Sequence, residues 1–555
     1  MESALRQVML LPRGFFMIAG KTFRMLLVLA MLSPLIASAT SLRFDVREFG
    51  AVGDGVTVNT VAIQKAIDQC SAEGGGVVLF AGGRFVTGTI YFKDNVTLRV
   101  EAGAVLLGST NIADYATDTH KNLYKNEPHM DRCLIFGRGV SGIGIEGNGI
   151  IDGRGGVGRI GEPGHRAFFP NQGDAKRNRP MLLRLMDCSR IRVRDITLRN
   201  PAAWTSAWLY CRDIVVDGIT LSSRVCNNGD GLDFDGCENV RVSNCAFDTS
   251  DDSICLQASR KDQPVRDVVI NNCVFVSKWA GIRIGLLSSG DFENVTVSNC
   301  VFRDIDDSGL KIQMCEGGAM RNMTFANLVM QNVPRPIFMT FCQQRAGVDS
   351  PEGGYAPMNT MGGFVFDGLQ IDSSRCGTNS AFIFTGMPGH PIRDIRLSNI
   401  QFTTGGGADA SMAARRSLNE FTPEVLEGWW PEYRRLGGTV LAHGIYARHV
   451  EGLTLNNVVI KTAAPDLRPA VVCDDVSDLD LNGVAMQGHA GAESLVRLQD
   501  VREAVVRNCQ VGGAIETFTL IEGKQSANVH VAQDNFARAS RLCEQEHTGE
   551  TPVPP

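Results

Sequence analysis

Two short segments of alternating apolar and polar residues, 231–234 and 253–256, each follow aspartate. Asp230 precedes the first segment, and the pair Asp251 and Asp252 precedes the second. A cluster of carboxylates suits acid/base cleavage of a glycosidic bond, because a protonated carboxyl donates to the leaving oxygen while an ionised one activates water. Crowding of like charges raises the pKa of one carboxyl in such a cluster, and that group becomes the proton donor.

Two further segments, 281–284 and 309–312, continue the pattern at intervals of 28 residues. In all four segments apolar residues flank one central residue, so that central residue points outward when the flanks point inward. The resulting column is Asp233, Cys255, Arg283 and Lys311. Neighbouring strands lie about 4.8 Å apart, which places the three catalytic candidates on one exterior patch beside the two cations. These cations would hold an anionic sugar.

A purely structural role of these aspartates is the competing interpretation. Asp-Asp also occurs at 306–307 and 474–475, and aspartate is a common turn residue. Asp251 and Asp252 are therefore distinguished from the other pairs only by their register with Asp230 and with the cations. Arg283 itself has two interpretations, as a substrate contact or as the partner of a nearby carboxylate.

A repeat positions these residues. The segment 240–247 recurs at 268–275, 295–302 and 323–330, with asparagines spaced by 28, 27 and 28 residues. Each copy has two short alternating strands that meet at a polar corner, and its apolar face is buried only when copies stack. A coil of three short strands uses this many residues. The sequence therefore predicts an all-β fold, a single-stranded right-handed parallel β-helix.

The open end of a solenoid needs a cap. Residues 61–70 have a helical apolar pattern and lie between Gly-Asp-Gly and Gly-Gly-Gly turns. We expect an N-terminal helical cap with the first coils over 40–108, and the β-helix catalytic domain over 109–540. Residues 405–438 interrupt the repeats and are interpreted as an inserted loop, and residues 541–555 as a disordered tail.

The first 39 residues are typical of a signal peptide. Basic residues precede an apolar run from Met25 to Leu32, Pro34 breaks the run, and Ala37 to Ala39 are small enough for cleavage. A membrane anchor is the competing interpretation, but this run is too short to span a bilayer. We expect a secreted or periplasmic monomer with no membrane association after cleavage.

Composition excludes several classes of protein. With 44% hydrophobic and 21% charged residues the chain is globular rather than disordered, and its net charge of -6 argues against a nucleic-acid binder. The 16 cysteines include no paired CxxC motif and no Cys/His cluster at metal-ligand spacing, so we predict no metal and no cofactor. Cys245, Cys273 and Cys300 each follow an asparagine of the repeat, as small buried hydrophobic residues would.

The cap segment and the aspartate motifs resemble those of glycoside hydrolase family 28, the polygalacturonases and rhamnogalacturonases of the pectin-lyase-like superfamily. Residues 49–67 resemble the N-terminal signature of that superfamily, the Asn-Thr-Asp motif is matched by 228–230, and the Asp-Asp motif is matched by 251–252. The resemblance implies that Asp251 is the general acid. It further implies that Asp230 and Asp252 position and deprotonate water in an inverting hydrolysis of galacturonate-containing polysaccharide.

Two motifs depart from this family. Its Gly-His-Gly appears here as 279–281, Trp-Ala-Gly, and its Arg-Ile-Lys becomes 311–313, Lys-Ile-Gln. The departures favour a divergent pectin-active branch that cuts rhamnogalacturonan or works from chain ends. The expected substrate contacts are Asn228, Arg283, Lys311, Gln313, Trp204 and Trp279.

Two other functions stay open. A polysaccharide lyase on the same scaffold would need an Arg or Lys base and often a calcium ion. A non-catalytic carbohydrate-binding solenoid would bind saccharide without turnover, and the aspartate cluster speaks against it.

Overall fold

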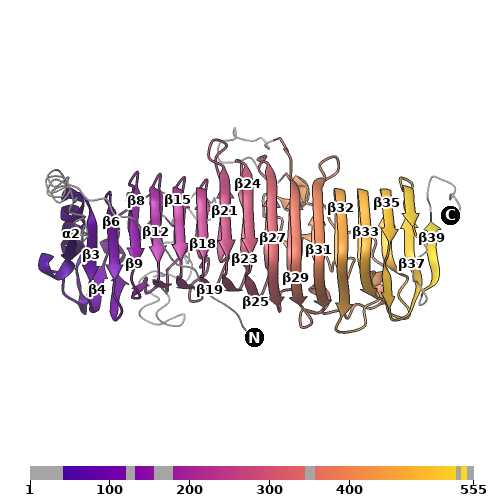
Figure 1. Ribbon diagram of the computed structural model, residues 1–555, viewed down its shortest axis with the longest axis horizontal. Coiled ribbons are helices and arrows are strands. Elements are labelled where there is room, and N and C mark those ends of the chain that lie inside the picture. Colours follow the sequence, from indigo (N-terminus) through magenta and orange to yellow (C-terminus); the bar gives the residue numbers. More distant parts are fainter. Residues whose placement is uncertain are drawn as a thin grey trace, which may run out of the picture. The chain divides into compact units, whose positions relative to one another are not determined.

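Strands that pair in parallel, each with a strand one coil away, make up nearly all of the regular structure of the chain (Figure 1). The computed structural model describes residues 42–119, 130, 132–155, 179–343, 357–532 and 539–546. The unit that contains these strands begins at Arg43. Three parallel sheets run along it, and this arrangement confirms the predicted parallel β-helix. The predicted signal peptide lies outside the described residues.

Sheet 1 carries the candidate site. Its strands are β5 (Ile90–Tyr91), β8 (Cys133–Arg138), β11 (Met181–Met186), β14 (Ser206–Leu209), β17 (Leu232–Asp235), β20 (Ile254–Ala258), β23 (Ala280–Ser288), β26 (Ser308–Met314), β28 (Arg335–Phe341), β30 (Phe382–Thr385), β34 (Ser494–Gln499), β37 (Ile515–Glu522) and β39 (Ala539–Glu546). The first residues of β32 (Ile445–Thr462) and β33 (Val471–Gln487) continue sheet 1 between β30 and β34.

Sheets 2 and 3 complete each coil. Sheet 2 contains β1 (Arg43–Asp45), β3 (Gly76–Phe80), β6 (Val96–Val100), β9 (Gly144–Glu146), β12 (Ser189–Arg194), β15 (Arg212–Asp217), β18 (Glu238–Ser243), β21 (Val265–Asn271), β24 (Phe292–Ser298), β35 (Arg502–Arg507) and β38 (Ala527–Val531). Sheet 3 contains β2 (Asp54–Val58), β4 (Gly83–Thr87), β7 (Ala104–Gly108), β10 (Ile150–Asp152), β13 (Thr197–Arg199), β16 (Thr220–Ser222), β19 (Ala246–Thr249), β22 (Val274–Ser277), β25 (Val301–Ile305) and β36 (Gln510–Gly512). Both sheets share the long strands β27 (Met320–Gln331), β29 (Gly362–Asp372), β31 (Ile392–Thr404), β32 and β33.

Apolar side chains from all three sheets fill the coil interior. The predicted stacks in sheet 1 are confirmed, because their members are fully buried in the main core: Ile254, Leu256, Ile282, Ile284, Leu310 and Ile312. In sheet 3, Phe247, Phe275 and Phe302 stack on successive coils, with ring centroids 5.1 and 4.8 Å apart. Each such burial contributes about 1.5–3 kcal/mol, so the repeat itself supplies the stability.

Left-handed asparagines form the corner between sheets 2 and 3. Asn244, Asn272, Asn299 and Asn327 have φ angles of 53° to 58°, a region that asparagine tolerates better than most residues do. Their amides stack, and Asn272 Nδ2 donates to Asn244 Oδ1 over 3.4 Å. The backbone requirement at this corner explains why asparagine marks the repeat.

Helix α2 (Thr60–Ala72) is the predicted cap. It buries Ile63, Ala66, Ile67 and Cys70 against the first strands of sheets 1 and 2, and these side chains join the main core. The 3-10 helix η1 (Val46–Phe49) lies beside it, while η2 (Ile112–Asp114) and η3 (Gly377–Asn379) lie in connections further along. No helix among the described residues has the length and apolar character needed to cross a membrane.

Residues 405–444, here called the strap, connect β31 to β32. The strap contains the short helices α4 (Ala410–Ala413) and α5 (Pro423–Leu426) and the 3-10 helix η4 (Tyr433–Leu436). A second apolar core joins the strap to the outer face of sheet 1: Leu418, Phe421, Leu426, Leu436, Val440, Leu441 and Ala442 pack with Cys315, Phe338, Cys342, Ala381, Ile383, Tyr446 and Val472. The strap is therefore a fixed cover on sheet 1.

The C-terminal prediction needs a correction. A disordered tail was expected from residue 541, but β39 extends to Glu546 and pairs in register with β37. The exposed edge of the last full coil offers unpaired backbone groups. The segment pairs with this edge, and Ala539 and Leu542 pack against the main core. Residues 547–555 lie outside the described residues, and the other domain boundaries stay predictions.

Candidate active site

The register of sheet 1 aligns the predicted column. Asp233 pairs with Cys255, Cys255 with Arg283, and Arg283 with Lys311, each on the next coil. The residues that flank each of them lie in the main core, so the column faces away from the coil interior. The alignment made from the sequence is confirmed.

Two stacked corners bring the three aspartates together. The Gly229 N–H donates to Ser250 Oγ over 3.1 Å, and the Gly231 N–H donates to the Asp252 carbonyl oxygen over 2.9 Å. Residues 228–230 therefore lie directly against residues 250–252 on the next coil. Asp230 and Asp252 are buried, whereas Asp251 is half-buried.

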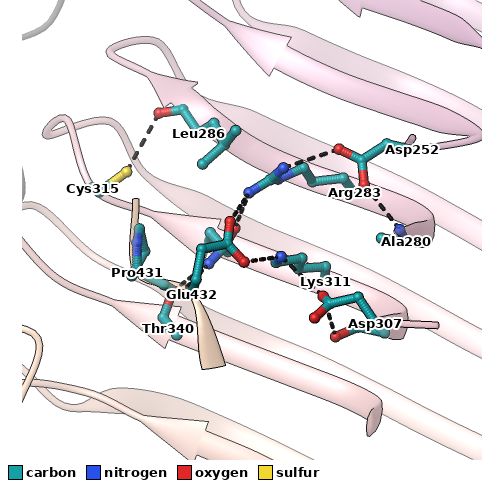
Figure 2. Close-up of polar contacts among 12 residues, drawn as sticks. Asp252, Ala280, Arg283, Leu286, Asp307, Lys311, Cys315, Thr340, Pro431 and Glu432 are labelled. Atoms are coloured by element: carbon teal, nitrogen blue, oxygen red, sulfur yellow. Dashed lines mark hydrogen bonds and ion pairs between the residues drawn. The ribbon is translucent and has the colours of Figure 1, made fainter. Parts of the chain in front are cut away.

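Asp252 is held by donors from the following coil (Figure 2). Its Oδ2 accepts from Arg283 Nη1 over 3.0 Å, and its Oδ1 accepts from the Ala280 N–H over 3.1 Å. Its own N–H donates to Asp251 Oδ1 over 3.1 Å. Charge-assisted hydrogen bonds of this kind fix the orientation of the carboxyl group, so Asp252 suits the role of base or water-orienting group.

Cys255 lies between two of the carboxylates. Its Sγ is 4.0 Å from Asp230 Oδ2 and 3.6 Å from Asp252 Oδ2, and the three ligand atoms lie within 4.8 Å of one another. Burial, reinforced by the neighbouring aspartates, raises the pKa of this thiol well above its ordinary value. In the structure the thiol is placed to donate to both carboxylates, so the trio forms a hydrogen-bonded cluster.

The two cations of the column lie beneath the strap. Glu432 Oε1 accepts from Arg283 Nη2 over 3.0 Å, and Glu432 Oε2 contacts Lys311 Nζ (Figure 2). Lys311 is fully buried and Arg283 is 5% exposed. Of the two interpretations of Arg283, the structure shows the pairing with nearby carboxylates. The expected anion position between the two cations is already filled by a carboxylate of the chain, because the strap folds over sheet 1.

Lys311 has a second carboxylate partner. Its Nζ lies 2.9 Å from Asp307 Oδ2, and Arg335 Nη2 donates to Asp307 Oδ1 over 2.8 Å. Burial disfavours the charged form of Asp307, but Lys311 and Arg335 outweigh it and hold the pKa of this carboxyl below its usual range. Asp307 is therefore a structural member of a buried ion network.

The remaining predicted contacts divide into two groups. Asn228 and Trp279 lie at the corners beside the aspartates and are half-buried; Arg179 Nη1 donates to Asn228 Oδ1 over 3.2 Å, and Lys311 Nζ lies 4.7 Å from the Trp279 ring centroid. Gln313 is fully buried and donates to the Pro431 carbonyl oxygen over 2.8 Å. Trp204 is buried within a small apolar cluster. Gln313 and Trp204 thus have packing partners within the chain in place of open surface.

Sequence reasoning missed Glu432. It contacts Arg283 across 149 residues of sequence and lies in the segment that breaks the repeat, so no periodic signal identifies it. Only the structure reveals it, through the packing of apolar strap residues against the face of sheet 1 that carries the charges.

Two open hollows lie elsewhere on the coil. One, of about 590 Å³, is lined by residues of sheet 3 such as Lys461, Gln487 and Gln510. The other, of about 780 Å³, is lined by residues of sheet 2 such as Arg396, Asp480 and Arg507. Neither contains the aspartates, so the location of the site rests on register and contacts rather than on concavity.

Known proteins share this architecture. Among solved structures, the chain resembles an exopolygalacturonase from Thermotoga maritima (TM-score 0.54, 19% identity, 76% of this chain and 92% of that one) and a family 28 exopolygalacturonase from Yersinia enterocolitica (TM-score 0.52, 21% identity, 92% and 79%). At these identities the likeness supports the fold.

Sequence relatives include a probable polygalacturonase of Vitis vinifera (29% identical, 53% of this chain and 62% of the relative) and an exo-poly-alpha-D-galacturonosidase of Dickeya chrysanthemi (27% identical, 62% and 64%). The chain thus matches less than two thirds of the length of either relative. The family model for glycosyl hydrolases family 28 matches residues 86–416, more than half of the chain. This match includes all three aspartates and ends within the strap, before Glu432. The chain belongs to glycosyl hydrolases family 28.

Proposed function

We propose that the chain is an inverting glycoside hydrolase that cleaves galacturonate-containing pectic polysaccharide. The observation that carries the proposal is the convergence of Asp230, Asp251 and Asp252 on two stacked corners, with Asp252 fixed by Arg283 and the Ala280 N–H. Family membership and the names of the relatives, polygalacturonase and exo-poly-alpha-D-galacturonosidase, support the reaction and the substrate class.

In the proposed reaction the half-buried Asp251 protonates the oxygen that leaves the scissile bond. Asp252, held by Arg283, and Asp230 orient a water molecule and remove its proton. The water attacks from the opposite face of the sugar, so the anomeric configuration inverts. The divergent motifs at 279–281 and 311–313 support a specificity other than that of a plain polygalacturonase, either cleavage of rhamnogalacturonan or action from chain ends.

The lyase alternative needs a basic Arg or Lys that abstracts a proton beside the uronate carboxyl. Arg283 and Lys311 are the nearby candidates, and both are buried in ion pairs with Asp252, Asp307 and Glu432. Each cation is already engaged by two carboxylates of the chain and is nearly or fully buried, so neither lies open to take a proton from a substrate. This geometry favours hydrolysis.

Product analysis tests the proposal. The purified chain is incubated with polygalacturonate, methyl-esterified pectin and rhamnogalacturonan, and the first-formed anomer is followed by NMR. Hydrolysis with inversion supports the proposal. Unsaturated products that absorb in the ultraviolet would assign the lyase reaction, and saccharide binding without cleavage would assign the non-catalytic solenoid.

We further propose that the chain is exported as a monomer after cleavage behind Ala39. N-terminal sequencing of the mature protein from a secreting host tests the cleavage, and a first residue of Thr40 is expected.

A further inference from the structure

A carboxylate of the chain occupies the cation pair beside the three aspartates. The two oxygens of Glu432 divide between Arg283 and Lys311, which is how a sugar carboxylate would bind two neighbouring cations. We propose that Glu432 determines substrate specificity, an inference that rests on the proposed function. Glu432 fills this anion position from within the chain, so the sugar unit that lies next to it carries no free carboxylate.

The charges around Glu432 are balanced without substrate, because Arg335 also pairs with Asp307 and three cations therefore face three carboxylates. Arg283 pairs with Asp252 and Glu432, and Lys311 pairs with Asp307 and Glu432. A uronate carboxylate brought here would face Glu432 and find both cations engaged, and like charges placed together oppose binding. A neutral sugar or an esterified uronate meets no such repulsion.

The position of Glu432 is fixed by packing. Its backbone lies at the start of η4, whose Leu436 is fully buried in the second core. The preceding residue, Pro431, is tied to sheet 1. Gln313 Nε2 donates to the Pro431 carbonyl oxygen, while Gln313 Oε1 accepts from Arg283 Nη2 over 2.8 Å. A displaceable gate would lack these contacts, so Glu432 acts as a permanent part of the site.

The test measures binding, so it does not depend on turnover. Isothermal titration calorimetry compares oligogalacturonate with its methyl ester, and with an oligosaccharide that alternates rhamnose and galacturonate, for the wild type and for Glu432→Gln. The isosteric amide keeps the strap packing, and Arg283 and Lys311 retain Asp252 and Asp307 as partners. The exposed strap residue Glu424 provides the control Glu424→Gln.

We expect the wild type to bind either the methyl ester or the alternating oligosaccharide at least tenfold more tightly than it binds oligogalacturonate. Glu432→Gln should reduce that ratio on the order of tenfold, as loss of one close charge contact does, and Glu424→Gln should not change it. A preference for the methyl ester would identify the sugar unit next to Glu432 as an esterified uronate. A preference for the alternating oligosaccharide would identify it as a neutral sugar.

Equal or tighter wild-type binding of oligogalacturonate, or no binding of any ligand, overturns the proposal, as does an unchanged ratio in Glu432→Gln. If that variant does not fold, the wild-type preference alone decides between these outcomes. Binding with the expected ratio but without cleavage would refute the proposed hydrolysis and leave the role of Glu432 standing.

Discussion

Asp252 and Arg283 form a buried ion pair between neighbouring coils, with Arg283 Nη1 3.0 Å from Asp252 Oδ2 and side chains 6% and 2% exposed for Arg283 and Asp252. The guanidinium also contacts Gln313 and Glu432. One side chain therefore joins the candidate catalytic carboxylate to the strap. This link couples the orientation of Asp252 to a segment far away in the sequence.

Arg283→Met is expected to lower the free energy of unfolding by about 3–5 kcal/mol, because removing one partner leaves buried carboxylates uncompensated. Urea denaturation measures this change. Arg266→Met is the matched control, since Arg266 pairs with Glu238 over 2.9 Å at the exposed surface and such pairs contribute at most about 1 kcal/mol. Equal losses in the two variants would contradict the assignment of a buried network.

Asp251→Asn is expected to reduce kcat by about 10²–10⁴-fold, because the amide cannot donate a proton to the leaving oxygen. Saccharide binding and the thermal unfolding midpoint should stay near wild type, since Asp251 is half-buried. Steady-state kinetics on the best pectic substrate gives the measurement.

The control for Asp251 must avoid Asp307. Asp307 occupies the aligned corner position two coils later, but it pairs with Lys311 and Arg335, so its replacement disturbs the fold. The neighbouring exposed Asp306 is suitable, and Asp306→Asn should retain wild-type kcat. Unchanged turnover in Asp251→Asn would make Asp251 a turn residue.

The fold and the catalytic cluster were predictable from the sequence because both follow from short-range periodicity. Alternation at residues such as Ile282 and Ile284 indicates the buried face, and the 28-residue interval sets which residues become neighbours on adjacent coils. Register alone thus aligned Cys255 with Arg283. Family resemblance added the roles proposed for the aspartates.

The environment of the cations was not predictable in the same way. Glu432 reaches Arg283 from an insertion that has no register with the coils, and its position depends on the packing of residues such as Phe421 and Leu436. The pairing of β39 with β37 was missed because the segment is mostly polar, and the apolar contacts of Ala539 and Leu542 with the main core leave only a weak periodic signal.

Activity is expected to survive exhaustive treatment with a chelator. The proposed reaction uses carboxylates and water, and the oxygens of Asp252 already accept from Arg283 and the Ala280 N–H. Release of reducing ends from a pectic substrate is measured before and after chelation. A loss of activity that calcium restores would contradict the metal-independent mechanism and favour the lyase.

Asp235 is expected to make the stability of the chain fall as the pH rises. This buried carboxyl accepts from the Ser259 N–H over 2.8 Å, but burial outweighs that bond and raises the pKa of Asp235 from 3.8 to about 6. A raised pKa in the folded state means that folding favours the protonated form. The contribution of the protonated carboxyl to the free energy of unfolding is fully present below pH 3.8 and is lost as the pH rises through about 6.

A shift of this size corresponds to about 3 kcal/mol. Asp235→Asn cannot ionise and keeps an oxygen acceptor for the Ser259 N–H, so the free energy of unfolding of this variant should lack that part of the pH dependence. Urea denaturation between pH 4 and pH 7 compares it with the wild type and with Asp267→Asn, a change at an exposed left-handed corner that asparagine tolerates. As the pH rises, the free energy of unfolding of Asp235→Asn should increase relative to that of the wild type. That of Asp267→Asn should follow the wild type. Parallel curves for all three proteins would show that Asp235 titrates near its ordinary pKa.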